Sequence, residues 1–181
     1  MGLESYNLLL VPHDSQVTIE DDIVDYVGGK RTPFSKAVEA ILSIKGIRAY
    51  VPPDITVRKK AECYYVYSDV KTIVEIEINA GLVEKEGIEE ISVRFAVTSN
   101  EETFEVAVFI CKVLNEQLRM KTIDMRLKEE IDLTNDFQIR RSQKAFEQKK
   151  RRFYEMYSLP YNCITEPMNC GKAFFEALRG K

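Results

Sequence analysis

In two stretches in the middle of the chain, every second side chain is Thr or apolar. This alternation restricts the possible folds more than any other feature of the sequence. Residues 72–79 and 91–97 each place Thr or apolar side chains at every second position. These positions are Thr72, Val74, Ile76 and Ile78 in the first stretch and Ile91, Val93, Phe95 and Val97 in the second. Because successive side chains of a strand point to opposite faces, the pattern predicts two strands of an antiparallel sheet with one buried face.

A long helix is predicted directly after these strands. Asn100 is a favourable N-cap, and the two Glu residues that follow it suit the positive end of the helix dipole. As far as Leu118, apolar residues lie on two sides of this helix, so it is predicted to be buried between layers or to cover an interface. Residues 61–69 and 121–129 are predicted to be further strands.

The first third of the chain adds two strands and two helices to this prediction. The second of these strands is short, begins at Ile47 and is ended by Pro52 and Pro53. Residues 5–12 have the apolar run of a strand, and residues 18–29 are interpreted as a short helix. A better helix follows, with Thr32 as its N-cap, Pro33 in its first position and Gly46 as its stop. Strands and helices in this order predict an α+β fold, with a ferredoxin-like or related antiparallel sheet covered by helices.

The last quarter of the chain is predicted to contain a long basic helix. We expect residues 1–133 to form the α+β body, and residues 134–181 to form this helix and a tail that pack on the body as one domain. Seven Lys or Arg residues and one Glu lie between Arg140 and Arg152, whereas the whole chain has a formal net charge of −3. Thr134 and Asn135 are the candidate N-caps.

The basic helix is amphipathic when its residues are projected at 100° each. One side forms a narrow apolar seam, which consists of Ile139, Phe146, Phe153 and Tyr157. The other side forms a basic face, which consists of Arg140, Lys144 and Arg151, with Arg141 and Arg152 beside them. Aromatic and basic residues are therefore interleaved in the sequence but separated on the helix.

Three interpretations of this helix remain open. The seam either docks on the body and leaves the basic face solvated, or it packs against another helix, in a homodimer or with a protein partner. The third interpretation is nucleic-acid binding by the basic face, because Lys and Arg neutralise phosphates. The position of the aromatic residues on the seam and the sequence pI of about 5.4 argue against this third interpretation.

Other candidate sites are weaker. The segment Gly28–Thr32 precedes a helix but lacks the glycine patterns of the P-loop and dinucleotide folds, so a flexible connector is favoured over an anion site. His13 is interpreted as a turn residue, and Glu75 and Glu77 as solvated residues of one strand face. No catalytic residue, metal site or cofactor is predicted.

These observations favour a non-enzymatic, cytoplasmic protein that acts through macromolecular contact, as a regulatory, accessory or toxin-neutralising module or by self-association. A protein partner or a homodimer is expected, and nucleic-acid binding through the basic face is the alternative. A small enzyme is the third hypothesis, and it requires a pocket near His13, Lys30 or Glu75. No apolar run is long enough to span a bilayer, so no membrane contact is expected.

Overall fold

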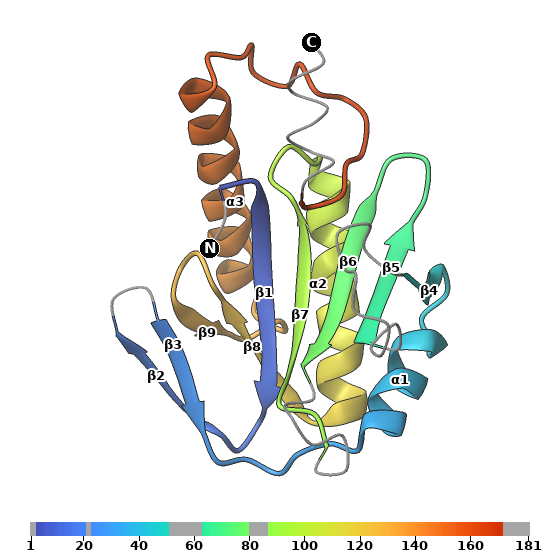
Figure 1. Cartoon of the computed structure of the whole chain (residues 1–181). Helices are drawn as coiled ribbons and strands as arrows, with labels where there is room; N and C mark the ends of the chain where they lie inside the picture. The colour runs from blue at the N-terminus through green and yellow to red at the C-terminus, as the bar shows by residue number, and fades with distance from the viewer. Residues whose placement is uncertain (1–2, 21–22, 51–62, 80–86, 172–181) are drawn as a thin grey trace.

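A computed structural model of the chain describes residues 3–20, 23–50, 63–79 and 87–171. The strands within these residues are β1 (Ser5–Pro12), β2 (Gln16–Glu20), β3 (Ile23–Val27), β4 (Ile47–Ala49), β5 (Tyr64–Ser68), β6 (Ile73–Asn79), β7 (Glu90–Ala96), β8 (Met120–Asp124) and β9 (Glu129–Ile131). The helices are α1 (Phe34–Ser43), α2 (Glu101–Leu118) and α3 (Asp136–Met156) (Figure 1). The last ten residues of the predicted tail, 172–181, and the predicted strand start at residues 61–62 lie outside the described residues.

Seven of these strands form one antiparallel sheet. Their order is β4-β5-β6-β7-β1-β8-β9, and β2 and β3 form a separate hairpin. The first strand of the chain therefore lies between β7 and β8, and both of its neighbours run antiparallel to it. The predictions of an α+β fold and of an antiparallel sheet are confirmed.

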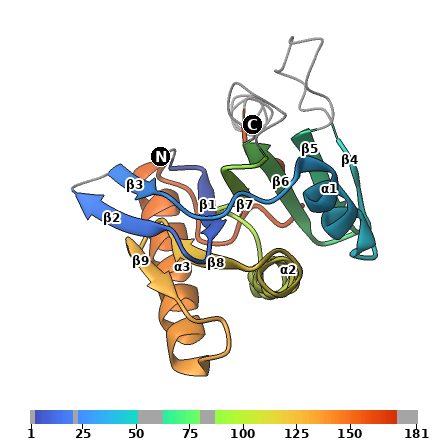
Figure 2. The same cartoon turned by 90° about the horizontal axis from the view of Figure 1, so that it is seen from below.

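The main core lies on the face of the sheet that the helices cover. It joins apolar residues of the central strands to α1, α2 and the seam residue Phe146 of α3. Four rings, those of Tyr6, Phe95, Phe104 and Phe146, pack together with centroid distances between 5.2 and 6.3 Å. Figure 2 shows α2 end-on between α1 and α3. Burial of each ring contributes roughly 1.5–3 kcal/mol relative to leaving it exposed, so this cluster fixes α2 and α3 to the same sheet.

The opposite face of the sheet carries a smaller apolar cluster under the β2–β3 hairpin. Leu9, Val11 and Ile123 pack there against residues of the hairpin, which include Val24 and Tyr26. The predicted helix at residues 18–29 is therefore wrong. Apolar residues at alternate positions bury one side of a hairpin, and this burial outweighs the weak helix signal of the acidic residues.

The predicted strand over residues 121–129 is also interrupted. The side chain of Asp124 accepts hydrogen bonds from the backbone N–H groups of Arg126 and Leu127, at 2.8 and 3.0 Å. Lys128 then has a φ of 57°, which turns the chain into β9. This local capping of a turn by Asp competes with continuation of the strand.

Of the other three predicted helix starts, two are confirmed. The side chain of Asn100 accepts from the N–H of Thr103, and that of Asn135 accepts from the N–H groups of Phe137 and Gln138. The hydroxyl of Thr32 instead lies 3.3 Å from the carbonyl oxygen of Leu118 and does not cap α1. No helix within the described residues is long and apolar enough to cross a membrane.

Candidate interaction surface

The inward side of α3 packs on the chain's own body. Phe146 belongs to the main core, and Ile139 is half-buried against it. Phe153 and its neighbour Tyr154 form a second, smaller core with Val97 and Ile164. Tyr157 is exposed but lies 4.8 Å from the Phe153 ring, measured between centroids. Three of the four seam residues therefore pack against this chain, which leaves no continuous seam for a partner helix.

A buried polar contact also joins α3 to the sheet. The Tyr6 hydroxyl donates to the Asp124 carboxylate at 2.6 Å, and the Ser142 hydroxyl of α3 donates to the same carboxylate. Burial and the nearby carboxylate raise the pKa of Tyr6 well above its ordinary value. All three residues are fully buried, so this contact stabilises α3 only while the tyrosine remains protonated.

Two of the seven cations in the basic segment are structural. Lys149 and Lys150 are only 7% and 8% exposed. Their ammonium groups donate to the backbone carbonyl oxygens of Ser5 and Ser99, respectively. Burial lowers the pKa of both lysines. The helical projection placed both lysines beside the seam and not on the basic face. The fold uses them to satisfy the carbonyl groups of Ser5, at the start of β1, and of Ser99, in the connection between β7 and α2.

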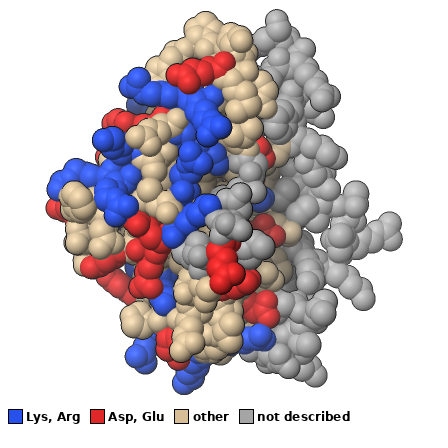
Figure 3. Space-filling model, turned by 90° about the vertical axis from the view of Figure 1, so that its left-hand side faces the viewer, with Lys and Arg blue, Asp and Glu red and all other residues tan. Residues whose placement is uncertain are grey.

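The five predicted residues of the basic face are all exposed, namely Arg140, Arg141, Lys144, Arg151 and Arg152. Arg141 forms an ion pair of 2.9 Å with Glu129, and the guanidinium of Arg151 lies 5.2 Å from the ring centroid of Tyr161. Figure 3 shows Lys and Arg side chains gathered in the upper half of this side of the molecule. At 1.5 Å per residue, these cations extend over about 18 Å of helix.

An apolar groove separates α3 from α2. It has a volume of about 280 Å³, and Phe104, Val108, Phe109 and Ile139 line it together with Glu105, Lys112 and Gln143. Phe109 is 56% exposed at this groove, and Phe137, near the start of α3, is 64% exposed. The apolar second side predicted for α2 is therefore not fully covered by this chain.

The two helices that border the groove carry opposite charges. The exposed residues of α2 include Glu101, Glu102, Glu105 and Glu116. The exposed residues of α3 include the five cations of the basic face. An acidic helix and a basic helix thus lie on the same face of the molecule, with exposed phenylalanine on both.

Glu75 and Glu77 do not form the solvated pair that the sequence predicts. Glu75 is only 4% exposed and lies 3.8 Å from the Arg94 guanidinium. Its carboxylate accepts from the Cys170 N–H at 2.8 Å and from the Asn169 side chain at 3.3 Å. The prediction for Glu75 is wrong because residues close to the C-terminus cover this part of the strand. Burial and the Glu75 carboxylate raise the pKa of Cys170.

The segment Gly28–Thr32 is held in place rather than loosely connected. Gly29 has a φ of +88°, and a Cβ there would lie 2.7 Å from the Cβ of Pro12. The carbonyl of Thr32 accepts from the N–H of Ile88 at 2.8 Å, and the Lys30 N–H donates to Asp14 at 3.0 Å. Only glycine fits at residue 29 without displacing the neighbouring strand end.

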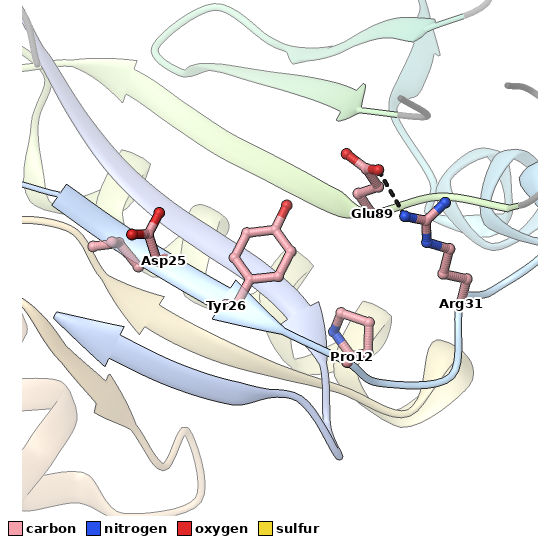
Figure 4. A pocket seen from close by; sticks show the side chains of 7 residues that line it. Pro12, Asp25, Tyr26, Arg31 and Glu89 are labelled. Carbon is pink, nitrogen blue, oxygen red and sulfur yellow. Dashed lines mark hydrogen bonds and ion pairs between the residues drawn. The ribbon is translucent and has the colours of Figure 1, made fainter. Parts of the chain in front are cut away.

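Two pockets lie beside this segment. One has a volume of about 310 Å³, and Pro12, Asp25, Tyr26, Arg31 and Glu89 contribute to its lining (Figure 4). Its Arg31 and Glu89 form an ion pair of 2.8 Å, drawn as a dashed line in Figure 4. The second pocket contains His13 and Lys30, so the concave site required by the enzyme hypothesis exists at that place.

The described lining of the second pocket places no serine or cysteine nucleophile beside His13. His13 is exposed, and its backbone N–H donates to the carbonyl of Arg119 at 3.0 Å. Among the described residues of this lining there is neither Ser nor Cys. Across the part of the chain that the structure describes, no three His, Cys, Asp or Glu side chains are grouped as a metal site would require.

No protein-family model matches the chain, and no curated protein or solved structure matches it significantly. The functional proposal therefore rests on the geometry and charge of the surfaces described above.

Proposed function

We propose that this protein is a non-enzymatic intracellular protein that acts through macromolecular contact, and that the face formed by α2 and α3 is its contact surface. The observation that carries the proposal is Phe109, which is 56% exposed at the rim of the apolar groove. Leaving a large apolar side chain in water forgoes roughly 1.5–3 kcal/mol. A partner that covers Phe109 would recover the share of this free energy that belongs to its exposed surface. A regulatory, accessory or toxin-neutralising role suits such a surface.

The partner that fits this surface best is a second copy of the chain. In a two-fold dimer, the same patch of both subunits meets, so the patch must be complementary to itself. The α2–α3 face meets this condition, because α2 of one copy would lie against α3 of the other, acid against base. With 18 and 21 residues, the two helices are about 27 and 31 Å long. This length is sufficient for an interface of standard size, about 800 Å² on each subunit.

Nucleic-acid binding is the second candidate, and the contact between Arg151 and Tyr161 favours it. Both side chains are exposed, and a ring beside a guanidinium is a stacking platform for an unpaired base. Two observations weigh against this candidate. Lys149 and Lys150 are buried, and Arg141 is already paired with Glu129. Fewer cations are therefore free for phosphates than the seven in the sequence.

We also infer that the centre of the sheet is a ferredoxin-like arrangement. Its strands lie in the order β8-β1-β7-β6 and are all antiparallel to their neighbours. Helices follow β1 and β7 in the chain order. The hairpin β2–β3, the edge strands β4 and β5, and the C-terminal β9 and α3 are then additions to this centre.

Sedimentation velocity over a range of concentrations tests the proposed contact. We expect the wild-type protein to dimerise and the Phe109→Glu variant to be monomeric, because a buried charge replaces the apolar contact. Leu42→Glu is the matched control, since Leu42 is also an exposed apolar residue of a helix, at 48%, but lies on α1. This variant should dimerise as the wild type does.

Two results would contradict the proposal. A wild-type protein that stays monomeric at every concentration rules out self-association through this face. Retention of the wild type on DNA or RNA at low salt, lost on replacing the five residues of the basic face with Gln, would favour the nucleic-acid candidate instead.

A further inference from the structure

A second group of cations lines a cavity where three connections of the chain meet. These connections lie at the lower end of the sheet in Figure 1. The cavity has a volume of about 530 Å³. The described residues that line it are His13, Asp14, Lys30, Arg31, Thr32, Pro33, Lys36, Leu118 and Arg119. They come from the β1–β2 turn, the segment between β3 and α1 with the first turn of α1, and the turn between α2 and β8. Positions distant in sequence thus form one concave surface.

The lining is strongly positive, and three of its charges are not neutralised. Within the described residues, the side chains of Lys30, Lys36 and Arg119 make no ion pair or hydrogen bond. The single carboxylate of the described lining belongs to Asp14, and it accepts the backbone N–H of Lys30. This hydrogen bond is the main cause of a lowered pKa for Asp14. Asp14 therefore serves mainly the backbone of the loop. The charge of Arg119 contributes to its lowered pKa, but the two side chains form no ion pair.

The backbone holds the cations around the cavity. Arg119 ends α2 in the left-handed conformation, with φ 54° and ψ 53°, and its carbonyl accepts from the His13 N–H at 3.0 Å. Thr32 is buried and its hydroxyl contacts the carbonyl of Leu118. These contacts tie the end of α2 to the β1–β2 turn and to the start of α1. The backbone segments that carry Lys30, Lys36 and Arg119 are consequently held beside one cavity.

We propose that this cavity binds a small molecule with a phosphate group, and that Lys30, Lys36 and Arg119 surround the phosphate. Lys and Arg are the side chains that proteins use for phosphate, through charge-assisted hydrogen bonds. The volume of the cavity lies within the usual range for small-molecule sites, roughly 300–1,000 Å³. The first turn of α1 contains no acidic residue and no side-chain cap, so its free N–H groups add to the positive potential.

Isothermal titration calorimetry at low salt tests this proposal with inorganic phosphate, pyrophosphate and a nucleoside triphosphate as probes. We expect binding of at least one probe, and the order of affinities distinguishes a site for free phosphate from a site for a larger phosphorylated molecule. Lys36→Gln and Arg119→Asn should each weaken binding about tenfold, the loss expected for one charge-assisted hydrogen bond. Asn is chosen because it tolerates the left-handed backbone at residue 119. Lys45→Gln, which changes an exposed lysine beyond the far end of α1, should bind as the wild type does.

The proposal is overturned if no probe binds at millimolar concentration, or if Lys36→Gln and Arg119→Asn bind with wild-type affinity. Lys36 is exposed, so the Lys36→Gln result decides the matter even if Arg119→Asn is unstable. The test is also independent of the proposed dimer. Phe109→Glu should bind phosphate normally, and Arg119→Asn should leave the sedimentation behaviour unchanged.

Discussion

The protein has two basic regions that differ in how their charge is assembled. The basic face of α3 comes from one continuous segment, Arg140–Arg152, and its exposed cations extend over about 18 Å of helix. The cavity at the lower end of the sheet gathers Lys30, Lys36 and Arg119 from separate parts of the chain. The extended arrangement suits a large surface, whereas the concave arrangement suits a small anion. The density of cations in a sequence therefore does not tell which of them can bind a ligand.

The two regions also differ in what holds them in place. The helix α3 is fixed by its inward side, through the rings around Phe146 and the contact between Tyr6 and Asp124. The cavity is fixed by backbone hydrogen bonds and by glycine in the segment between β3 and α1. Substitutions on the inward side of α3 should therefore lower the stability of the fold. Substitutions of the cavity cations should weaken ligand binding with little effect on stability.

The largest expected effect is on the inward side of α3. Phe146→Ala should lower the free energy of unfolding by about 3–5 kcal/mol, because it removes a fully buried ring and leaves a cavity. Phe137→Ala is the control, since the same residue type on the same helix is 64% exposed, and it should change the free energy by less than about 0.5 kcal/mol. Urea denaturation measures both values. Equal losses would mean that the inward side does not anchor α3.

A smaller effect is expected from Tyr6→Phe, which removes the hydroxyl that contacts the buried Asp124. The free energy of unfolding should fall by about 1–3 kcal/mol at neutral pH. Urea denaturation at pH 7 measures it. A loss close to zero would show that the hydroxyl contributes nothing to the anchoring of α3.

The pH dependence of the same variant is a separate prediction. In the folded protein, the pKa of Tyr6 is raised above its ordinary value of 10.0. The tyrosine therefore contributes its full stabilisation below pH 10. Above pH 10, the Tyr6 hydroxyl ionises in the unfolded chain but stays protonated in the folded protein, so its contribution falls as the pH rises. Above pH 10, the stability of Tyr6→Phe should fall less steeply than that of the wild type, by about 1.4 kcal/mol per pH unit. If the stabilities of the two proteins fell equally steeply above pH 10, this would contradict the burial of a neutral Tyr6 hydroxyl.

The smallest effect on stability is expected at the cavity. Arg119 has a φ of 54°, where glycine is not strained, so Arg119→Gly should stay within about 1 kcal/mol of the wild type. Its phosphate affinity should nevertheless fall about tenfold. Thermal unfolding and calorimetry on the same sample check both values. A loss of stability as large as that of Phe146→Ala would show that this arginine supports the fold instead of a ligand.

The parts of the fold that depend on local pattern could be predicted from the sequence. The alternation of β6 and β7 and the caps Asn100 and Asn135 all involve residues within a few positions of one another. The interruption at Asp124 is equally local, but the hydrogen bonds of a single aspartate outweigh an apolar periodicity that continues past it.

The candidate sites were harder to predict because they depend on contacts between distant residues. Glu75 is covered by Asn169 and Cys170, more than ninety positions later, and no local pattern carries that information. Lys149 and Lys150 are adjacent to exposed arginines in the sequence, yet both reach carbonyl groups of other elements. The helical projection placed both lysines beside the seam, and this position was the available signal that they differ from the basic face.

The most direct test of the account is a mixing experiment with two charge-reversed proteins. The first carries Glu105→Lys and Glu116→Lys, so that both helices of its contact face are basic. The second carries Arg140→Glu, Lys144→Glu and Arg151→Glu, so that both are acidic. Native mass spectrometry and sedimentation velocity should find each protein monomeric alone and an equimolar mixture dimeric, because α2 of each would meet an oppositely charged α3. A mixture that stays monomeric, or single variants that still dimerise, would contradict the assignment of α2 and α3 as the contact surface.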